Sequence, residues 1–363
     1  MPYRLLALCA LAFFLTACDS GTTISDDDPL AEARANPGEW TWIDVEGATC
    51  RDGSATGFGV RLQDDAENLA IYLEGGGACF DRITCALNDP NFTEAEFDAG
   101  VATTGQSGIF SMGAENPVGD WNMVYVPYCT GDVHGGSATD VTVSGVTGPQ
   151  QFVGHENMKR YLDLVQPNLE TPDRVLLTGV SAGGFGALVN FAEVADRFSS
   201  SRLTLLDDSG PIFYDDNVFS SEISASFVSL YNFPDALPSD AGDLFETDGL
   251  EGIYSYYADR YPSATFGLSS YLEDSTIRFF FEGGQPDGEI TGQEFADGLR
   301  DLRMKLPEDW ATYYASGDDH TFLRVTSRFT STSAGVALND WLADLLDGQA
   351  PNVDPAISAS PLM

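Results

Sequence analysis

Short, nearly continuous apolar runs recur along the chain and alternate with stretches of helical periodicity. The runs are rich in Val, Ile, Leu and aromatic residues, a pattern typical of strands that helices cover on both faces. The predicted strands are 55–62, 68–75, 122–129, 174–180, 202–208, 264–271 and 310–317. The predicted helices are 149–166, 182–197, 290–304 and 334–347. This alternation favours an α/β domain built on one mostly parallel sheet.

Three segments depart from this pattern and set the predicted boundaries of a domain at 39–346. Residues 210–263 mix prolines, aromatics and acids, and are predicted to form a cap-like insertion beside the site. Residues 19–38 are acidic and lack periodicity, which predicts a flexible tether. Residues 347–363 contain three prolines and are predicted to be a disordered tail.

The N-terminal segment 1–18 has the features of a signal peptide that is removed from the mature protein. Its apolar run, Leu5–Leu15, is too short to span a membrane as a mature helix. The run ends in Leu-Thr-Ala-Cys, which resembles the bacterial lipobox, whose cysteine becomes the lipidated first residue. We therefore expect an exported protein that a lipid on Cys18 anchors to the bacterial cell envelope. An ordinary secretory signal is the alternative.

The charge balance restricts the possible partners. With 17 Lys+Arg against 56 Asp+Glu, the formal net charge is −39. Phosphate backbones require a basic patch, so nucleic acid is excluded as a natural partner. An acidic surface of this kind suits a saline medium that screens self-repulsion.

Cysteine spacing supports export. Apart from Cys18 and one cysteine in the signal segment, the chain has four: Cys50, Cys79, Cys85 and Cys129. Cys79 and Cys85 are six positions apart, which predicts a small disulfide loop and leaves Cys50 to pair with Cys129. A zinc site competes with this interpretation, but the chain has no CxxC pair and only three histidines.

The candidate nucleophile is Ser181, in the sequence Gly-Val-Ser-Ala-Gly between a predicted strand and a predicted helix. This is the context of a nucleophile elbow, where a sharp turn exposes the serine and glycines avoid collisions beside it. The helix N-terminus favours developing negative charge. A glycine-rich turn with a capping serine is the alternative.

A second glycine-rich segment, Leu73–Phe80, follows the predicted strand 68–75. Hydrolases of this kind place backbone N–H groups for the oxyanion at such a position. We assign Gly76, Gly77 and the N–H of Ala182 as the donors. A phosphate-binding turn is the alternative, but the segment lacks a P-loop lysine and the dinucleotide spacing.

The candidate base is His320, because it follows the last predicted strand, where hydrolases that share the Ser…Asp/Glu…His order place it. His134 precedes the elbow, and His155 is expected to have a surface or capping role. The candidate acid is Asp274, directly after the predicted strand 264–271. Its competitors are Asp208, Glu273 and Glu282.

Together these motifs resemble the pectin acetylesterase/Notum family of serine carboxylesterases over roughly residues 40–330. The resemblance implies an α/β-hydrolase fold, a triad of Ser181, Asp274 and His320, the same two disulfides, and no metal or organic cofactor. The Notum branch has bulky aromatics where this chain has Gly77 and Ala78, which argues against a long-chain lipid pocket.

The leading hypothesis is an exported, monomeric serine esterase that removes acetyl or other short acyl groups from polysaccharide. Hydrolysis of lipid or small aryl esters is a second hypothesis, which an apolar cap would favour. A third is a lipid-anchored binding protein that kept the hydrolase scaffold without its catalysis, because a fold alone does not establish activity.

Overall fold

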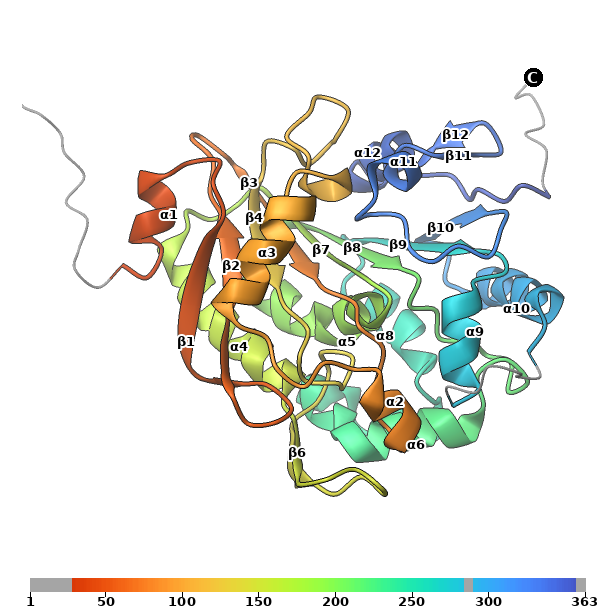
Figure 1. Ribbon diagram of the computed structural model, residues 1–363. Coiled ribbons are helices and arrows are strands. Elements are labelled where there is room, and N and C mark those ends of the chain that lie inside the picture. Colours follow the sequence, from red (N-terminus) through yellow and green to blue (C-terminus); the bar gives the residue numbers. More distant parts are fainter. Residues whose placement is uncertain (1–27, 284–289, 357–363) are drawn as a thin grey trace, which may run out of the picture.

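The computed structural model describes residues 28–283 and 290–356, and an eight-stranded sheet forms its centre (Figure 1). Six neighbouring strands, from β4 to β10 in the sheet order, are parallel to one another. At the other edge, β2 pairs antiparallel with β4, and β1 pairs antiparallel with β2. In sheet order the strands are β1 (Thr41–Thr49), β2 (Ala55–Arg61), β4 (Asn122–Val126), β3 (Asn68–Leu73), β7 (Arg174–Val180), β8 (Arg202–Asp208), β9 (Thr265–Tyr271) and β10 (Trp310–Ala315). The prediction of a mostly parallel sheet is confirmed.

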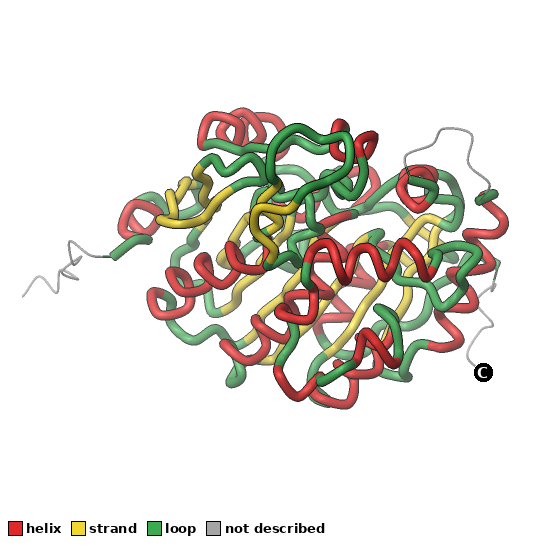
Figure 2. The backbone as a smooth tube through the Cα atoms, turned by 90° about the horizontal axis from the view of Figure 1, so that it is seen from below, coloured by secondary structure: helices red, strands yellow, loops and turns green. Residues whose placement is uncertain are grey.

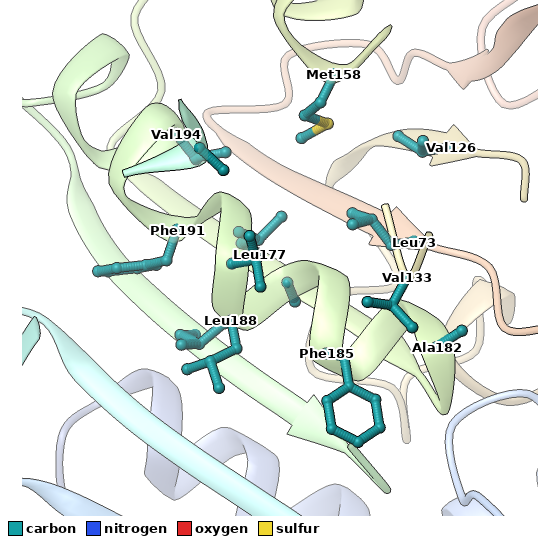
Figure 3. Packing of buried hydrophobic residues seen from close by; sticks show 14 of the residues in the cluster. Leu73, Val126, Val133, Met158, Leu177, Ala182, Phe185, Leu188, Phe191 and Val194 are labelled. Atoms are coloured by element: carbon teal, nitrogen blue, oxygen red, sulfur yellow. The ribbon is translucent and has the colours of Figure 1, made fainter. Parts of the chain in front are cut away.

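Helices cover both faces of the sheet, as Figures 1 and 2 show. One face packs against α4 (Gly154–Val165) and α5 (Ala182–Arg197), and the other against α3 (Glu94–Thr104) and α12 (Leu338–Leu346). Side chains along β3 alternate between the two cores, because successive residues of a strand point to opposite faces. Figure 3 shows the α5 side of this packing, where Leu188 and Phe191 lie close to Leu177 of β7.

The predicted insertion between β8 and β9 contains helices. They are α6 (Ser221–Tyr231), α7 (Leu244–Thr247) and α8 (Gly252–Arg260). Beyond β9 lie α9 (Ser275–Phe281) and α10 (Gly292–Lys305). The remaining short elements are α1 (Ala31–Ala35), α2 (Arg82–Ala86), α11 (Thr326–Phe329) and the hairpins β5 (Ala138–Val141) with β6 (Gln150–Phe152) and β11 (Thr332–Ser333) with β12 (Val336–Ala337).

The structure differs from the predictions at both ends of the domain. Leu30 and Ala33 are completely buried, so the end of the predicted tether 19–38 belongs to the folded domain. Residues 347–356, predicted as part of a disordered tail, are ordered. The Val353 backbone accepts a hydrogen bond from the N–H of Tyr314 at 2.8 Å and donates one to the oxygen of Thr312 at 2.8 Å. This pairing satisfies the otherwise open edge of β10.

The signal segment and Cys18 lie outside the described residues. Within the described ranges, no helix is both long and apolar enough to cross a membrane. The two predicted disulfides, Cys50–Cys129 and Cys79–Cys85, are confirmed.

Candidate active site

Ser181 occupies a strained turn between β7 and α5. Its backbone φ of 58° and ψ of −122° lie in a region that non-glycine residues rarely adopt. The turn is tight because a Cβ on Gly179 would collide with the carbonyl of Gly183, and one on Gly183 would collide with the carbonyl of Leu73. The glycines on either side of the serine are therefore required by the close approach of three backbone segments.

His320 and Asp274 follow adjacent parallel strands, β10 and β9, whose carboxyl ends meet at one edge of the sheet. Nδ1 of His320 lies 2.7 Å from Oδ2 of Asp274. The other carboxylate oxygen accepts hydrogen bonds from the N–H groups of Thr276 and Ile277, each at 3.0 Å, and so caps α9. The Asp274 side chain is completely buried. These contacts fix the carboxylate, which in turn orients the imidazole and leaves Nε2 for proton transfer.

The competing carboxylates have other partners. Glu282 accepts a hydrogen bond from the N–H of Ile290, and Glu273 is exposed. Asp208 is buried, and its carboxylate accepts hydrogen bonds from the N–H groups of Phe322 and Leu323. The geometry therefore favours Asp274 as the partner of His320.

The glycine segment after β3 lies against the Ser181 turn. A Cβ on Gly75 would be 2.6 Å from the Val180 oxygen and 3.0 Å from Cβ of Ser181. A Cβ on Gly76 would be 2.6 Å from the Tyr128 ring, and Gly77 adopts a positive φ of 78°. The segment can therefore approach the serine only because it has no side chains.

Two residues whose structural role the sequence did not reveal support this glycine segment. His134 is buried, and its Nε2 donates a hydrogen bond to the Glu74 oxygen at 2.7 Å. Burial lowers the pKa of His134 to about 4, so the ring is neutral at pH 7. The Tyr128 hydroxyl donates to the oxygen of Gly77 and accepts from the N–H of Val133, each at 2.8 Å.

The expectation that His155 lies at the surface is wrong. Only 3% of the residue is exposed, and its Nδ1 lies 2.8 Å from Oδ1 of Asn190. The Asn190 amide also donates to the oxygen of His134 at 2.8 Å. His155 and His134 thus belong to one buried hydrogen-bonded network behind the glycine segment, which leaves His320 as the candidate base.

Ser181 opens onto a small apolar pocket with a volume of about 20 Å³. Gly77 and Ala182 lie in its wall beside the serine, and Phe227 of α6 brings the cap into it. The Phe280 ring of α9 covers Gly77, since its Cε1 would lie 2.8 Å from a Cβ there. The other lining residues are Ala78, Val133, Phe185, Ile277 and Phe281. No cluster of His, Cys, Asp and Glu able to hold a metal occurs in the part of the chain that the structure describes.

Comparison with known proteins identifies the family of the chain. The family model of pectinacetylesterase matches residues 35–240, more than half of the chain. Palmitoleoyl-protein carboxylesterase notum2 of Xenopus laevis is 34% identical over 152 residues, which cover 40% of this chain and 30% of that protein. Human palmitoleoyl-protein carboxylesterase NOTUM is 30% identical over 154 residues, covering 41% of this chain and 30% of that protein. The matched region thus spans less than a third of these relatives.

The same architecture occurs in a solved structure, that of the Wnt deacylase Notum from Drosophila. The two superpose with a TM-score of 0.66 at 20% sequence identity, over 87% of this chain and 96% of that one. At this identity the likeness establishes the fold, and the family model establishes the relationship. The chain belongs to the pectinacetylesterase family and has the α/β-hydrolase fold.

Proposed function

We propose that this protein is a serine esterase whose catalytic residues are Ser181, His320 and Asp274. The observation that carries the proposal is the 2.7 Å contact between His320 and the buried carboxylate of Asp274, at the same sheet edge as the strained Ser181 turn. Nε2 of His320 takes the Ser181 proton as Oγ attacks the ester carbonyl, and returns it to the departing alcohol. Water then hydrolyses the acyl-serine through the same base.

The proposed oxyanion donors are the backbone N–H groups of Gly76, Gly77 and Ala182. Gly77 and Ala182 line the pocket together with Ser181, which supports this assignment. Hydrogen bonds from buried His134 and Tyr128 hold the carbonyls of the glycine segment, so its amides are fixed before the charge develops. Such pre-organised donors stabilise a tetrahedral oxyanion strongly.

The proposed substrate is a polysaccharide that carries acetyl or other short acyl groups. The pocket beside Ser181 is apolar, which suits an acyl chain, and Phe280 occupies the space over Gly77 that a longer chain would need. The family description, pectinacetylesterase, supports an acetylated carbohydrate. Esters of longer acyl groups are the second candidate, because curated relatives are named palmitoleoyl-protein carboxylesterases. The apolar side chains that the cap, α5 and α9 contribute to the pocket wall also favour this candidate.

We also propose that the protein is exported, monomeric and anchored through Cys18. The two disulfides support folding in an oxidising compartment.

The test measures hydrolysis of p-nitrophenyl esters from acetate to decanoate, and release of acetate from acetylated pectin and xylan. A fluorophosphonate probe reports the nucleophile, with Ser181→Ala as the control. We expect labelling of the parent protein alone, highest kcat/KM on the shortest esters, and acetate release from a polysaccharide. A folded parent that neither reacts with the probe nor hydrolyses any ester is a non-catalytic binding protein. A preference for decanoate favours the second candidate.

A further inference from the structure

Asp208 stands between the elements that carry the proposed catalytic residues. It ends β8, which lies in the sheet between β7, leading to Ser181, and β9, leading to Asp274. Its side chain is completely buried, and it does not line the apolar pocket. The proposed reaction assigns it no chemical step, although a buried carboxylate costs considerable free energy unless it is well hydrogen-bonded.

The hydrogen bonds of Asp208 join two distant segments. Its backbone oxygen accepts from the N–H of Ser181 at 2.7 Å. Its Oδ2 accepts from the N–H groups of Phe322 at 2.7 Å and Leu323 at 2.9 Å, in the loop just after His320. One residue therefore holds both the nucleophile turn and the loop that carries the base.

The carboxylate is itself held in place from the other side. Its Oδ1 accepts hydrogen bonds from the hydroxyls of Ser269 at 3.1 Å and Ser209 at 3.2 Å. Ser269 lies directly opposite Asp208 in the β8–β9 pairing. Both carboxylate oxygens are thus used, and the orientation of the side chain is fixed by the sheet.

The loop after His320 needs such an anchor. Thr321 adopts a positive φ of 59°, which is strained for a β-branched residue and must be maintained by surrounding contacts. Phe322 stacks on Tyr271, with ring centroids 4.2 Å apart, and Arg328 donates to the oxygen of His320 at 2.6 Å. The bonds to Asp208 satisfy the two N–H groups immediately beyond the strained residue.

From these contacts we propose that Asp208 is a positioning residue, which holds the His320 loop in register with Ser181 for proton transfer. This role rests on the proposed function. The anchoring depends on the acceptor atoms of the Asp208 side chain, which the hydroxyls of Ser269 and Ser209 hold in place. The acceptor role can be tested, because asparagine keeps one acceptor oxygen for the N–H groups of Phe322 and Leu323, whereas alanine keeps none.

Several titratable groups face Asp208. Burial raises the pKa of Asp208 to about 6, although the hydrogen bonds from Leu323, Phe322 and Ser269 and the charge of His320 lower it. Asp207, Tyr72 and Tyr271 are the other neighbours that interact with its charge. The carboxylate that contacts the His320 ring is Asp274, and the carboxylate that anchors the loop just after His320 is Asp208.

The experiment compares Asp208→Ala, Asp208→Asn and the matched control Asp207→Asn, which changes an equally buried carboxyl of the same strand that bonds Gly210 instead. For Asp208→Ala we expect kcat on p-nitrophenyl acetate and the rate of fluorophosphonate labelling to fall about 100-fold, with KM within about threefold, because misplacing a reacting group by about 1 Å costs that much. Asp208→Asn should recover most of this loss, because its amide oxygen can still accept from the loop. Asp207→Asn should leave kcat and the rate of fluorophosphonate labelling unchanged.

Each outcome bears on a different statement. An active parent whose Asp208→Ala variant is folded and equally active refutes the positioning role alone. If Asp208→Ala does not fold, the Asn variant decides, because a folded Asp208→Asn protein whose kcat falls about 100-fold refutes anchoring through the acceptor oxygen. A parent that neither hydrolyses esters nor reacts with the probe refutes the proposed function and, with it, this role.

Discussion

The substitution Asp274→Asn tests the proposed triad most directly. In the parent, one carboxylate oxygen accepts the N–H groups of Thr276 and Ile277, and the other faces Nδ1 of His320. The amide oxygen of asparagine should keep the two backbone hydrogen bonds, which turns its NH2 group toward Nδ1. His320 would then carry its proton on Nε2, the tautomer that cannot accept the proton of Ser181.

The size of the effect follows from the cost of the opposite amide orientation. Turning the amide would leave two buried N–H groups facing NH2, at about 1–3 kcal/mol each, or about 2–6 kcal/mol together. At about 1.36 kcal/mol per factor of ten, the competent tautomer falls about 30-fold to 10⁴-fold. We therefore expect kcat to fall within this range, with KM nearly unchanged because Asp274 does not line the pocket.

The assay is steady-state hydrolysis of p-nitrophenyl acetate, with circular dichroism and thermal unfolding as controls for folding. Ser181→Ala and His320→Ala should lose at least as much activity, and adding Asp274→Asn to either should have little further effect, because the three residues act as a unit. A folded Asp274→Asn protein within a few-fold of the parent would show that another carboxylate orients His320.

Three further predictions concern the pocket, stability and anchoring. Phe280→Ala should open the space over Gly77 and raise kcat/KM on longer acyl esters about fourfold per added methylene, because each buried CH2 contributes about 0.8 kcal/mol. Phe279 lies outside the pocket wall, so Phe279→Ala should leave kcat/KM unchanged. An unchanged dependence of kcat/KM on acyl-chain length in Phe280→Ala would argue against a gate at Phe280. Since the folded pKa of His134 is about 4 against 6.5 in the unfolded chain, the free energy of unfolding should fall by about 3 kcal/mol as the pH drops from above 6.5 to 4. His134→Gln, which can still donate to Glu74, should flatten that dependence in denaturant titrations at pH 7 and pH 5, and an equally steep dependence in the variant would assign it to other groups. Cys18→Ser should move the protein from the membrane fraction to the soluble fraction or leave it unprocessed, and unchanged partitioning would contradict the lipid anchor.

The sequence alone determined the central elements and the order of the candidate site residues. Strands 174–180 and 202–208 and helix 182–197 have the bounds predicted for them, because each is buried along most of its length and therefore reads as a clear apolar pattern. The turn at Ser181 was also recognisable, because Gly-Val-Ser-Ala-Gly is a short contiguous motif between a predicted strand and a predicted helix. The cysteine pairing followed from spacing and number.

Elements at the margin of the fold were not recognisable in the same way. β1 is an antiparallel edge strand with several exposed positions, and α3 buries only Phe97, so neither has a strong periodic pattern. Residues 347–356 resemble a disordered tail in composition. Their order depends on pairing with the open edge of β10, a contact that their own sequence does not specify.

The tertiary structure decided which of many similar side chains has which role. Among 56 acidic residues, only the meeting of two strand ends shows that Asp274 faces His320, while Asp208 holds the following loop. Likewise, the ring of Phe280 covers Gly77 across about 200 residues of sequence, and His134 supports the carbonyl of Glu74. Local sequence fixes turns and periodicity because these depend on neighbouring residues, whereas hydrogen bonds between distant segments form only when the whole sheet brings their ends together.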